Sequence, residues 1–181
     1  MKNRIIYRSS AVSCLLLCAA LFLLSCAPSP PDYFAFRGQS ATAELRGELF
    51  GKSFCAKLIL SPQESGCAAS LLYLSLGEIR DLQISALYGA DGETAGEGSV
   101  TLGGVSHSCE PAALQGLLAP AAALLTLCEP SSVTHQTGEY TLAFADGSVL
   151  TLGEDGIPRG VHTEKVDFWV VWWENAENLG K

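Results

Sequence analysis

The stretch ATAELRGELFGKSFCAKLIL, residues 41–60, decides the fold. From Ala41 to Leu49, small and apolar residues alternate with Thr, Glu and Arg, which is the period of two expected of a half-buried strand. Gly51 marks a turn, and the alternation resumes from Phe54 to Leu60. The stretch therefore predicts an antiparallel hairpin that buries one face.

Further strand candidates lie outward from this hairpin, separated by turns that contain Gly or Asp. The predicted strands cover Ala69–Ser75, Leu82–Tyr88, Ser99–His107, Tyr140–Phe144, Ser148–Leu152 and Val166–Glu174. Asp146-Gly147 and Asp155-Gly156 follow the late strands. Because Asp-Gly supplies the positive φ of a tight turn, these pairs indicate successive chain reversals.

Only one segment is predicted to be helical. Pro111 suits the first helical position, and apolar residues recur at helical spacing from there to Cys128. Pro120 is expected to kink or split this helix. Since the segment has almost no polar face, the helix is expected to be buried on several sides. About eight or nine strands with one helical insertion predict an α+β fold, in which an antiparallel sheet curls around the helix.

The N-terminus has the layout of an export signal. Lys2, Arg4 and Arg8 precede an apolar run over residues 11–24, which is shorter than the roughly 20 residues that a spanning helix needs. The run ends in Leu23-Leu24-Ser25-Cys26. This ending resembles the lipobox of bacterial lipoproteins, which implies that Cys26 is diacylated and becomes the mature N-terminus. An uncleaved anchor and an ordinary secretory cleavage are the alternatives.

The chain as a whole resembles the LolA/LolB-like family of lipoprotein-sorting proteins, and more closely its Gram-positive lipoproteins. The hairpin over 41–60, the insertion at Pro111, the late Tyr140-Thr-Leu-Ala-Phe pattern and the final aromatic strand carry this resemblance. It implies an open antiparallel half-barrel wrapped around the kinked helical insertion. Members of the family bind acyl chains in an apolar cavity or offer a docking surface at the envelope.

The resemblance and the N-terminal layout together predict the organisation of the chain. The expected parts are a signal peptide over 1–25, a lipidated Cys with a Pro-rich tether over 26–33, a single LolA/LolB-like domain over 34–174 and a polar tail over 175–181. The family's sorting carrier is soluble, whereas a lipid on Cys26 would tether this chain. An anchored role at the extracytoplasmic face of the cell membrane is therefore expected.

The charge of the chain restricts its partners. The formal net charge is −8; without the three basic residues that precede Cys26, 8 basic residues face 19 acidic ones, which gives −11. Such a chain repels phosphate backbones and anionic headgroups, so nucleic acid is excluded as a partner. Contact with the membrane is expected through the lipid on Cys26 rather than through a basic patch.

Four cysteines follow Cys26, namely Cys55, Cys67, Cys109 and Cys128. In an exported chain they could pair in any of three ways. Free, buried thiols are favoured, because a core of this size does not need disulfides.

The sequence contains no signature of an enzyme. His107, His135 and His162 are far apart, and His107 with Cys109 and Cys128 lacks the CxxC spacing of a zinc site. The Asp-Gly pairs lack the remaining ligands of a calcium loop. No catalytic residue, metal or cofactor is therefore expected.

The aromatic strand over 166–174 is the best candidate for function. If one face lines a cavity, an acyl chain would contact either Trp169, Val171 and Trp173 or their neighbours Phe168, Val170 and Trp172. Leu117 and Leu118 of the helix are further ligand-binding candidates. Core packing is the favoured account of such an aromatic stripe.

These observations predict a non-enzymatic, membrane-anchored envelope lipoprotein. It is expected to bind an apolar ligand, either a lipid or a lipidated protein, in the half-barrel. The alternative is a structural or docking lipoprotein with a filled core that binds a protein partner.

Overall fold

The structure is a computed structural model that describes residues 31–89 and 92–175. The predicted signal peptide and Cys26 lie outside these residues. Tyr33–Lys181 forms one compact unit, and every residue of the hydrophobic core belongs to it. Because this unit contains its own core, we expect it to fold without the residues that precede it.

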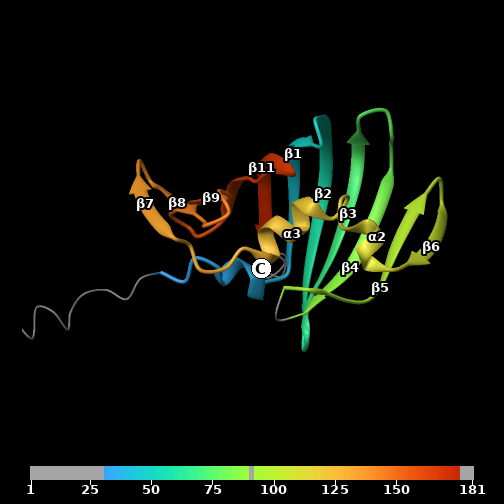
Figure 1. Cartoon of the computed structure of the whole chain (residues 1–181), viewed down its shortest axis with the longest axis horizontal. Coiled ribbons are helices and arrows are strands. Elements are labelled where there is room, and N and C mark those ends of the chain that lie inside the picture. The colour runs from blue at the N-terminus through green and yellow to red at the C-terminus, as the bar shows by residue number, and fades with distance from the viewer. Residues whose placement is uncertain (1–30, 90–91, 176–181) are drawn as a thin grey trace, which may run out of the picture. The chain divides into compact units, whose positions relative to one another are not determined.

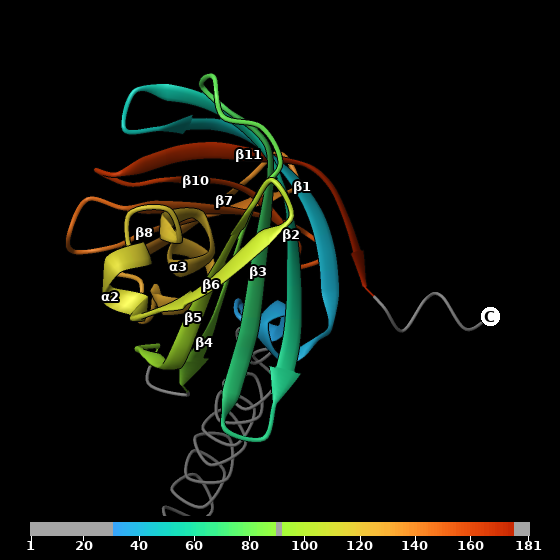
Figure 2. The ribbon, with the colours of Figure 1, turned by 90° about the vertical axis from the view of Figure 1, so that its right-hand side faces the viewer.

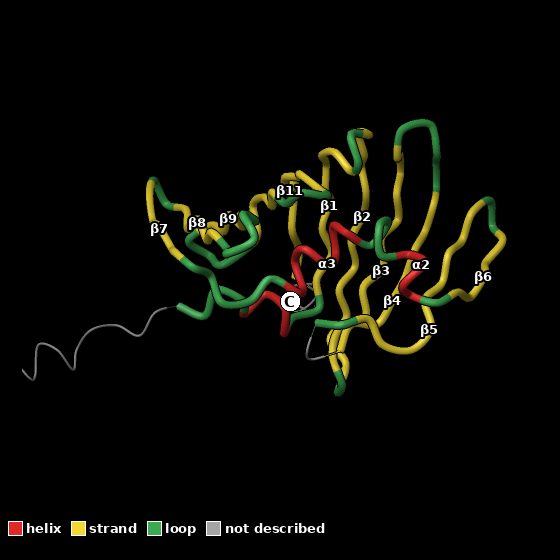
Figure 3. The backbone as a smooth tube through the Cα atoms, in the orientation of Figure 1, coloured by secondary structure: helices red, strands yellow, loops and turns green. Residues whose placement is uncertain are grey.

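The described residues form one antiparallel sheet of eleven strands, in the order β6-β5-β4-β3-β2-β1-β11-β10-β9-β8-β7 (Figure 1; Figure 3). The strands are β1 (Ala41–Leu49), β2 (Lys52–Gln63), β3 (Gly66–Leu76), β4 (Leu82–Gly89), β5 (Thr94–Leu102), β6 (Val105–Cys109), β7 (Ser132–Gln136), β8 (Glu139–Ala143), β9 (Val149–Gly153), β10 (Pro158–His162) and β11 (Val166–Asn175). Nearly all neighbours in the sheet are also neighbours in sequence, except that β1 pairs with β11. The first and last strands thus join two meanders into one sheet.

Three short helical segments accompany the sheet: the 3₁₀ turn η1 (Ala35–Gly38), α2 (Pro111–Leu114) and α3 (Ala119–Thr126). Both α-helices lie on the same face of the curved sheet (Figure 2). Leu118 and Leu124 are completely buried there among inward-facing residues of the central strands. We call this the inner face, and the opposite one the outer face.

The hairpin predicted over 41–60 is present. β1 alternates buried residues with more exposed ones along its whole length, and it pairs with β2 in continuous register. Phe50 and Gly51 form the two-residue turn, with φ of 51° and 70°. Positive φ at both positions matches the right-handed twist of the flanking strands.

The predicted fold class is wrong. The prediction was an α+β half-barrel of about eight or nine strands wrapped around a kinked helix, whereas the described residues form mostly one eleven-stranded antiparallel sheet with only two short α-helices. Helix covers too few residues for the sheet to wrap around it. The helices instead occupy part of one face.

The sequence pattern does not predict β6, β7 and β10 as separate strands. The predicted strand over 99–107 is two strands, β5 and β6, because Gly103 and Gly104 form a two-residue turn with positive φ. No strand is predicted over β7 or β10. All five residues of β7 are exposed, so this strand lacks the apolar alternation by which a half-buried strand is found.

The helix predicted from Pro111 to Cys128 is split and not kinked, because the segment contains two separate helices, α2 and α3. Pro120 lies in the first turn of α3, where a missing N–H costs no hydrogen bond. The proline therefore starts a second helix rather than bending a single one.

Gly47 allows β1 and β11 to approach closely. A Cβ atom added at this glycine would lie 2.0 Å from the carbonyl oxygen of Asp167 and 2.7 Å from Cβ of Phe168. Phe168 is paired with Gly47 in the ladder and is buried. At this position, the backbones of the two strands that join the meanders can approach so closely only because Gly47 has no side chain.

A bulge changes the faces of β11. The register between β1 and β11 shifts so that Glu44 pairs with Trp172 and Leu45 with Val170, which leaves Val171 without a partner in the ladder. Trp173 then joins Val170 on the inner side, while Trp172 is exposed like Trp169. The strict alternation expected along this strand is therefore broken at Val171.

Candidate functional site

A cleft of about 600 Å³ opens on the inner face beside α3. We call it the α3 cleft. It is lined by residues of the helical segment, the ends of β4 and β5, the β8–β9 turn and the β10–β11 turn; these include Tyr88, Glu93, Ala119, Ala122, Ala123, Thr126, Leu127, Asp146, Glu164 and Lys165. Its volume lies within the range of small-molecule pockets, roughly 300–1,000 Å³.

The helical wall of the α3 cleft is made of small apolar side chains. Ala119 and Ala123 are buried, and Ala122 is half-buried between them along the helix. Leu127 continues the wall past the end of α3. Larger side chains would fill this space, whereas the short alanine side chains leave it empty. The wall therefore offers a ligand both room and an apolar surface.

Arg37 holds the C-terminal end of that wall. Its Nε donates to the carbonyl oxygen of Leu124 at 2.8 Å, and its Nη2 donates to that of Leu127. The guanidinium also lies 4.2 Å from the ring centre of Phe34. Because the last carbonyls of a helix lack intrahelical partners, this side chain caps α3 and positions Leu127.

Tyr73 fastens the other end of the helical segment to the sheet. It is completely buried, and its hydroxyl donates to the carbonyl oxygen of Leu117. This contact, together with the burial of Leu118, fixes how far α3 lies above the strands. The depth of the α3 cleft depends on it.

Tyr73→Phe is therefore expected to destabilise the protein by about 1–3 kcal/mol, because Leu117 keeps a buried carbonyl oxygen without a donor. Urea unfolding of the 33–181 unit followed by circular dichroism measures the difference. An unchanged unfolding midpoint would show that the hydroxyl does not hold the helical segment.

Tyr88 lines the α3 cleft from β4. Its side chain is only 2 % exposed, and burial raises the pKa of its hydroxyl. Among the described residues, its Oη is the only buried side-chain nitrogen or oxygen atom without a hydrogen-bond partner. Such a group costs free energy in the folded state, so its presence beside a cleft calls for a reason.

Charged groups surround the α3 cleft with an excess of negative charge. The lining includes the carboxylates of Glu93, Asp146 and Glu164 and the ammonium of Lys165. Hydrogen bonds from the backbone N–H and the hydroxyl of Ser148 lower the pKa of Asp146. Asp146 is thus ionised well below neutral pH, and the lining as a whole is acidic.

The structure does not bring the predicted ligand-binding residues together. Leu118 is buried in the core, and Leu117 is half-buried. Trp173 is half-buried against Phe36, with 5.8 Å between ring centres. Trp169 and Val171 are exposed, Trp169 by 57 %. None of these five residues lines the α3 cleft.

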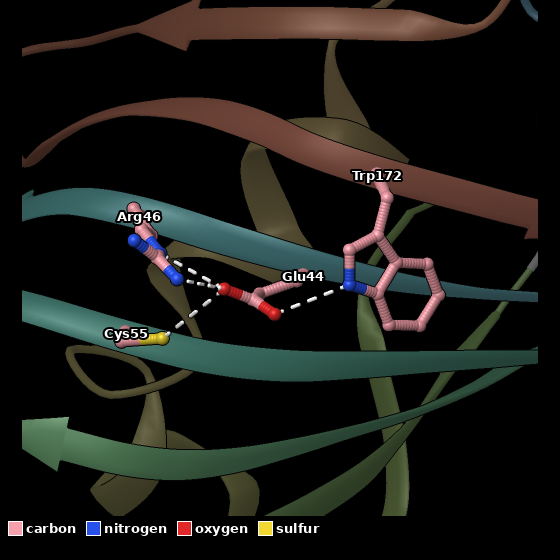
Figure 4. A network of polar contacts seen from close by, with 4 residues as sticks. All are labelled: Glu44, Arg46, Cys55 and Trp172. Atoms are coloured by element: carbon pink, nitrogen blue, oxygen red, sulfur yellow. Dashed lines mark hydrogen bonds and ion pairs between the residues drawn. The ribbon is translucent and has the colours of Figure 1, made fainter.

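A polar network lies on β1, β2 and β11 (Figure 4). Oε1 of Glu44 accepts hydrogen bonds from Arg46, at 2.7 Å from Nη2 and 2.8 Å from Nε, and lies 3.7 Å from the Cys55 sulfur. Its Oε2 accepts from Nε1 of Trp172 at 3.1 Å. The bonds from Arg46 and then from Trp172 lower the pKa of Glu44. Glu44 is therefore already engaged as a hydrogen-bond acceptor.

The cysteines in the described part of the chain are free thiols. Burial and the neighbouring Glu44 carboxylate raise the pKa of Cys55, and burial raises that of Cys67. These thiols are therefore protonated at neutral pH, which opposes a nucleophilic role. Residues 31–89 and 92–175 contain no group of three or more His, Cys, Asp or Glu side chains arranged to hold a metal ion.

Only part of the α3 cleft can be predicted from the sequence. The near absence of polar residues in the helical segment indicates burial, and the alanines at 119–123 are visible as a run. Tyr88 looks like any apolar position of an alternating strand, and no pattern shows that its hydroxyl lacks a partner. The acidic residues belong to turns that the fold alone brings to the cleft.

Comparison of the chain with models of protein families, with curated proteins and with solved structures finds no match. The described helices are all too short to cross a membrane.

Proposed function

We propose that this protein is a lipid-anchored, non-enzymatic binding protein of the cell envelope that takes a small amphipathic ligand into the α3 cleft. The lipobox-like ending at Cys26 supports the anchor. The cleft itself carries the proposal for binding: about 600 Å³ of space lies against a wall of alanines held in place by Arg37 and Tyr73.

The combination of lining groups supports an amphipathic ligand. The alanine wall offers apolar contact, while the ends of the strands and the turns add carboxylates, hydroxyls and one ammonium. Apolar contact buries the body of a ligand, and polar groups orient it by hydrogen bonds. This site replaces the apolar interior of the half-barrel expected from sequence.

A substitution that fills the cleft tests the proposed binding of a ligand. The uncharged fluorophore N-phenyl-1-naphthylamine is expected to bind the 33–181 unit with a rise in fluorescence, and Ala122→Trp is expected to weaken that binding at least about tenfold. Tenfold corresponds to 1.4 kcal/mol, less than the loss of one large buried apolar contact.

Ala113→Trp is the matched control, because Ala113 is exposed on α2 and does not line the cleft. It should leave probe affinity unchanged. If the fluorophore does not bind, or if both variants bind it as the unaltered unit does, the α3 cleft is not a binding site.

A docking lipoprotein that binds a protein partner is the second candidate function. The complete burial of Leu118 and Leu124 between helices and sheet favours it, because the interior there is filled. Under this function a protein partner would co-purify with the anchored chain, and Ala122→Trp would leave the complex intact.

A further inference from the structure

Three exposed apolar side chains follow one another closely along β11. Trp169 is 57 % exposed, Val171 45 % and Trp172 38 %; we call these three residues the tryptophan patch. Trp169 pairs with Arg46 of β1, and Trp172 pairs with Glu44. Because cross-strand partners share a face and both β1 residues point away from the core, the two tryptophans lie on the outer face. Exposed apolar residues gathered in one place mark an interaction site.

Glu44 holds one ring of the patch in a fixed position. Its Oε2 accepts a hydrogen bond from Nε1 of Trp172 at 3.1 Å, while Arg46 binds the other carboxylate oxygen (Figure 4). The polar atom of this indole is therefore bonded within the protein, and the part of the ring left exposed is apolar. A ring ordered before a partner arrives loses little freedom on binding.

The charges around the tryptophan patch do not favour an anionic partner. By the register of the strands, the outer-face groups nearby are two cations and four carboxylates, namely Arg46, Lys57, Glu44, Glu48, Asp167 and Glu174. Without the residues that precede Cys26, the chain carries 8 basic and 19 acidic residues, a formal charge of −11. The surface that meets this face is therefore expected to be neutral or zwitterionic.

The proposed lipid on Cys26 would keep a bilayer close to the start of the domain. The compact unit begins at Tyr33, seven residues after Cys26. An extended chain spans at most about 3.6 Å per residue, so this tether reaches no farther than about 25 Å.

The residues that follow the tether lie beside the tryptophan patch. Phe36 packs against Trp173, with 5.8 Å between ring centres. Trp172 lies opposite Glu44, three positions after Ala41 in β1, which is about 10 Å along the strand. Other exposed apolar residues are farther away: Phe50, for example, lies beyond the opposite end of β1, about 30 Å from Ala41. The tryptophan patch is thus the exposed apolar surface close to the anchored end.

We propose that the tryptophan patch rests in the headgroup region of the bilayer in which Cys26 is anchored. Tryptophan is enriched at that boundary, because its ring offers an apolar body with a polar edge. The contact is weak by itself and forms because the tether keeps the patch at a high effective concentration beside the bilayer. The outer face then lies against the membrane, and the α3 cleft, on the inner face, opens away from it. This inference rests on the lipid anchor of the proposed function.

Quenching of tryptophan emission by brominated lipid tests the inference. The acylated protein, as the bacterium produces it, is reconstituted into vesicles of phosphatidylcholine that carry bromine on the acyl chains near the headgroups. The chain has three tryptophans. Bromine is expected to quench the emission of the unaltered protein and of Trp173→Phe. Trp169→Phe and Trp172→Phe combined should abolish the quenching, since only Trp173, packed against Phe36, still emits.

Trp169→Asp is the variant that breaks the contact. It is expected to lose the quenching of Trp172 while the acyl chains still hold the protein on the vesicle. Leu102→Asp is the matched control, because it introduces the same charge at an apolar residue that is 52 % exposed and lies outside the patch; its quenching should stay unchanged.

The possible failures are distinguishable. An acylated protein that bromine does not quench, or a Trp169→Asp variant quenched like the unaltered protein, overturns the inference while the lipid anchor stands. A protein whose mass shows no acyl groups on Cys26 removes the anchor of the proposed function and the inference together.

Discussion

Replacement of Gly47 by alanine is expected to cost at least about 3 kcal/mol of folding free energy, which is the range of severe overpacking. The added Cβ would lie 2.0 Å from a carbonyl oxygen of the paired strand, and backbone atoms inside a ladder cannot move aside as a flexible side chain can. Relief requires β1 and β11 to separate. These two strands join the halves of the sheet, so the loss affects the whole unit.

Urea unfolding of the 33–181 unit followed by circular dichroism measures this effect. Gly38→Ala is the control, because an added Cβ there meets nothing within 4 Å; its unfolding midpoint should stay close to that of the unaltered unit. If the two variants unfold at the same urea concentration, β1 and β11 do not pair as described.

Cys26→Ser is expected to move the protein from the membrane fraction to the soluble fraction. Two acyl chains on one cysteine hold a protein stably at a bilayer, whereas a single chain binds only marginally. Fractionation of the producing bacterium, with detection of the full chain, measures the distribution.

Cys18→Ser serves as the control for this experiment, since Cys18 lies within the same apolar run but follows a large leucine rather than Ser25. That variant should remain in the membrane fraction. Membrane retention of Cys26→Ser would contradict lipid anchoring at this position and favour an uncleaved N-terminal anchor.

Much of the sheet can be predicted from sequence because its central strands alternate. From Ala43 to Tyr88, most apolar positions of the pattern meet one common core, although Ile59 and Leu74 are exposed. The prediction misses the edge strand β7, where exposure removes the alternation, and also β10, which lies inside the sheet. For the helical segment, a kink and a split at Pro120 are both compatible with the sequence, because proline disrupts a helix interior and is also well suited to begin a helix.

The α3 cleft could not be predicted in the same way. Its walls come from four separate parts of the chain, and neither a strand pattern nor a helical period relates them. The aromatic strand is the strongest sequence signal for a site, yet the bulge at Val171 leaves Trp172 exposed, as Trp169 already is, and turns Trp173 inward. Local alternation cannot show such a register shift.

The most direct test of ligand binding in the α3 cleft is a nuclear magnetic resonance titration of the 33–181 unit carrying labelled alanine methyl groups and tryptophan indoles. N-phenyl-1-naphthylamine is the ligand. The account predicts that the methyl signals of Ala119, Ala122 and Ala123 shift on titration, while the indole signals of Trp169 and Trp172 stay in place. Shifts confined to those two indoles, or no shift at the three methyl groups, would contradict it.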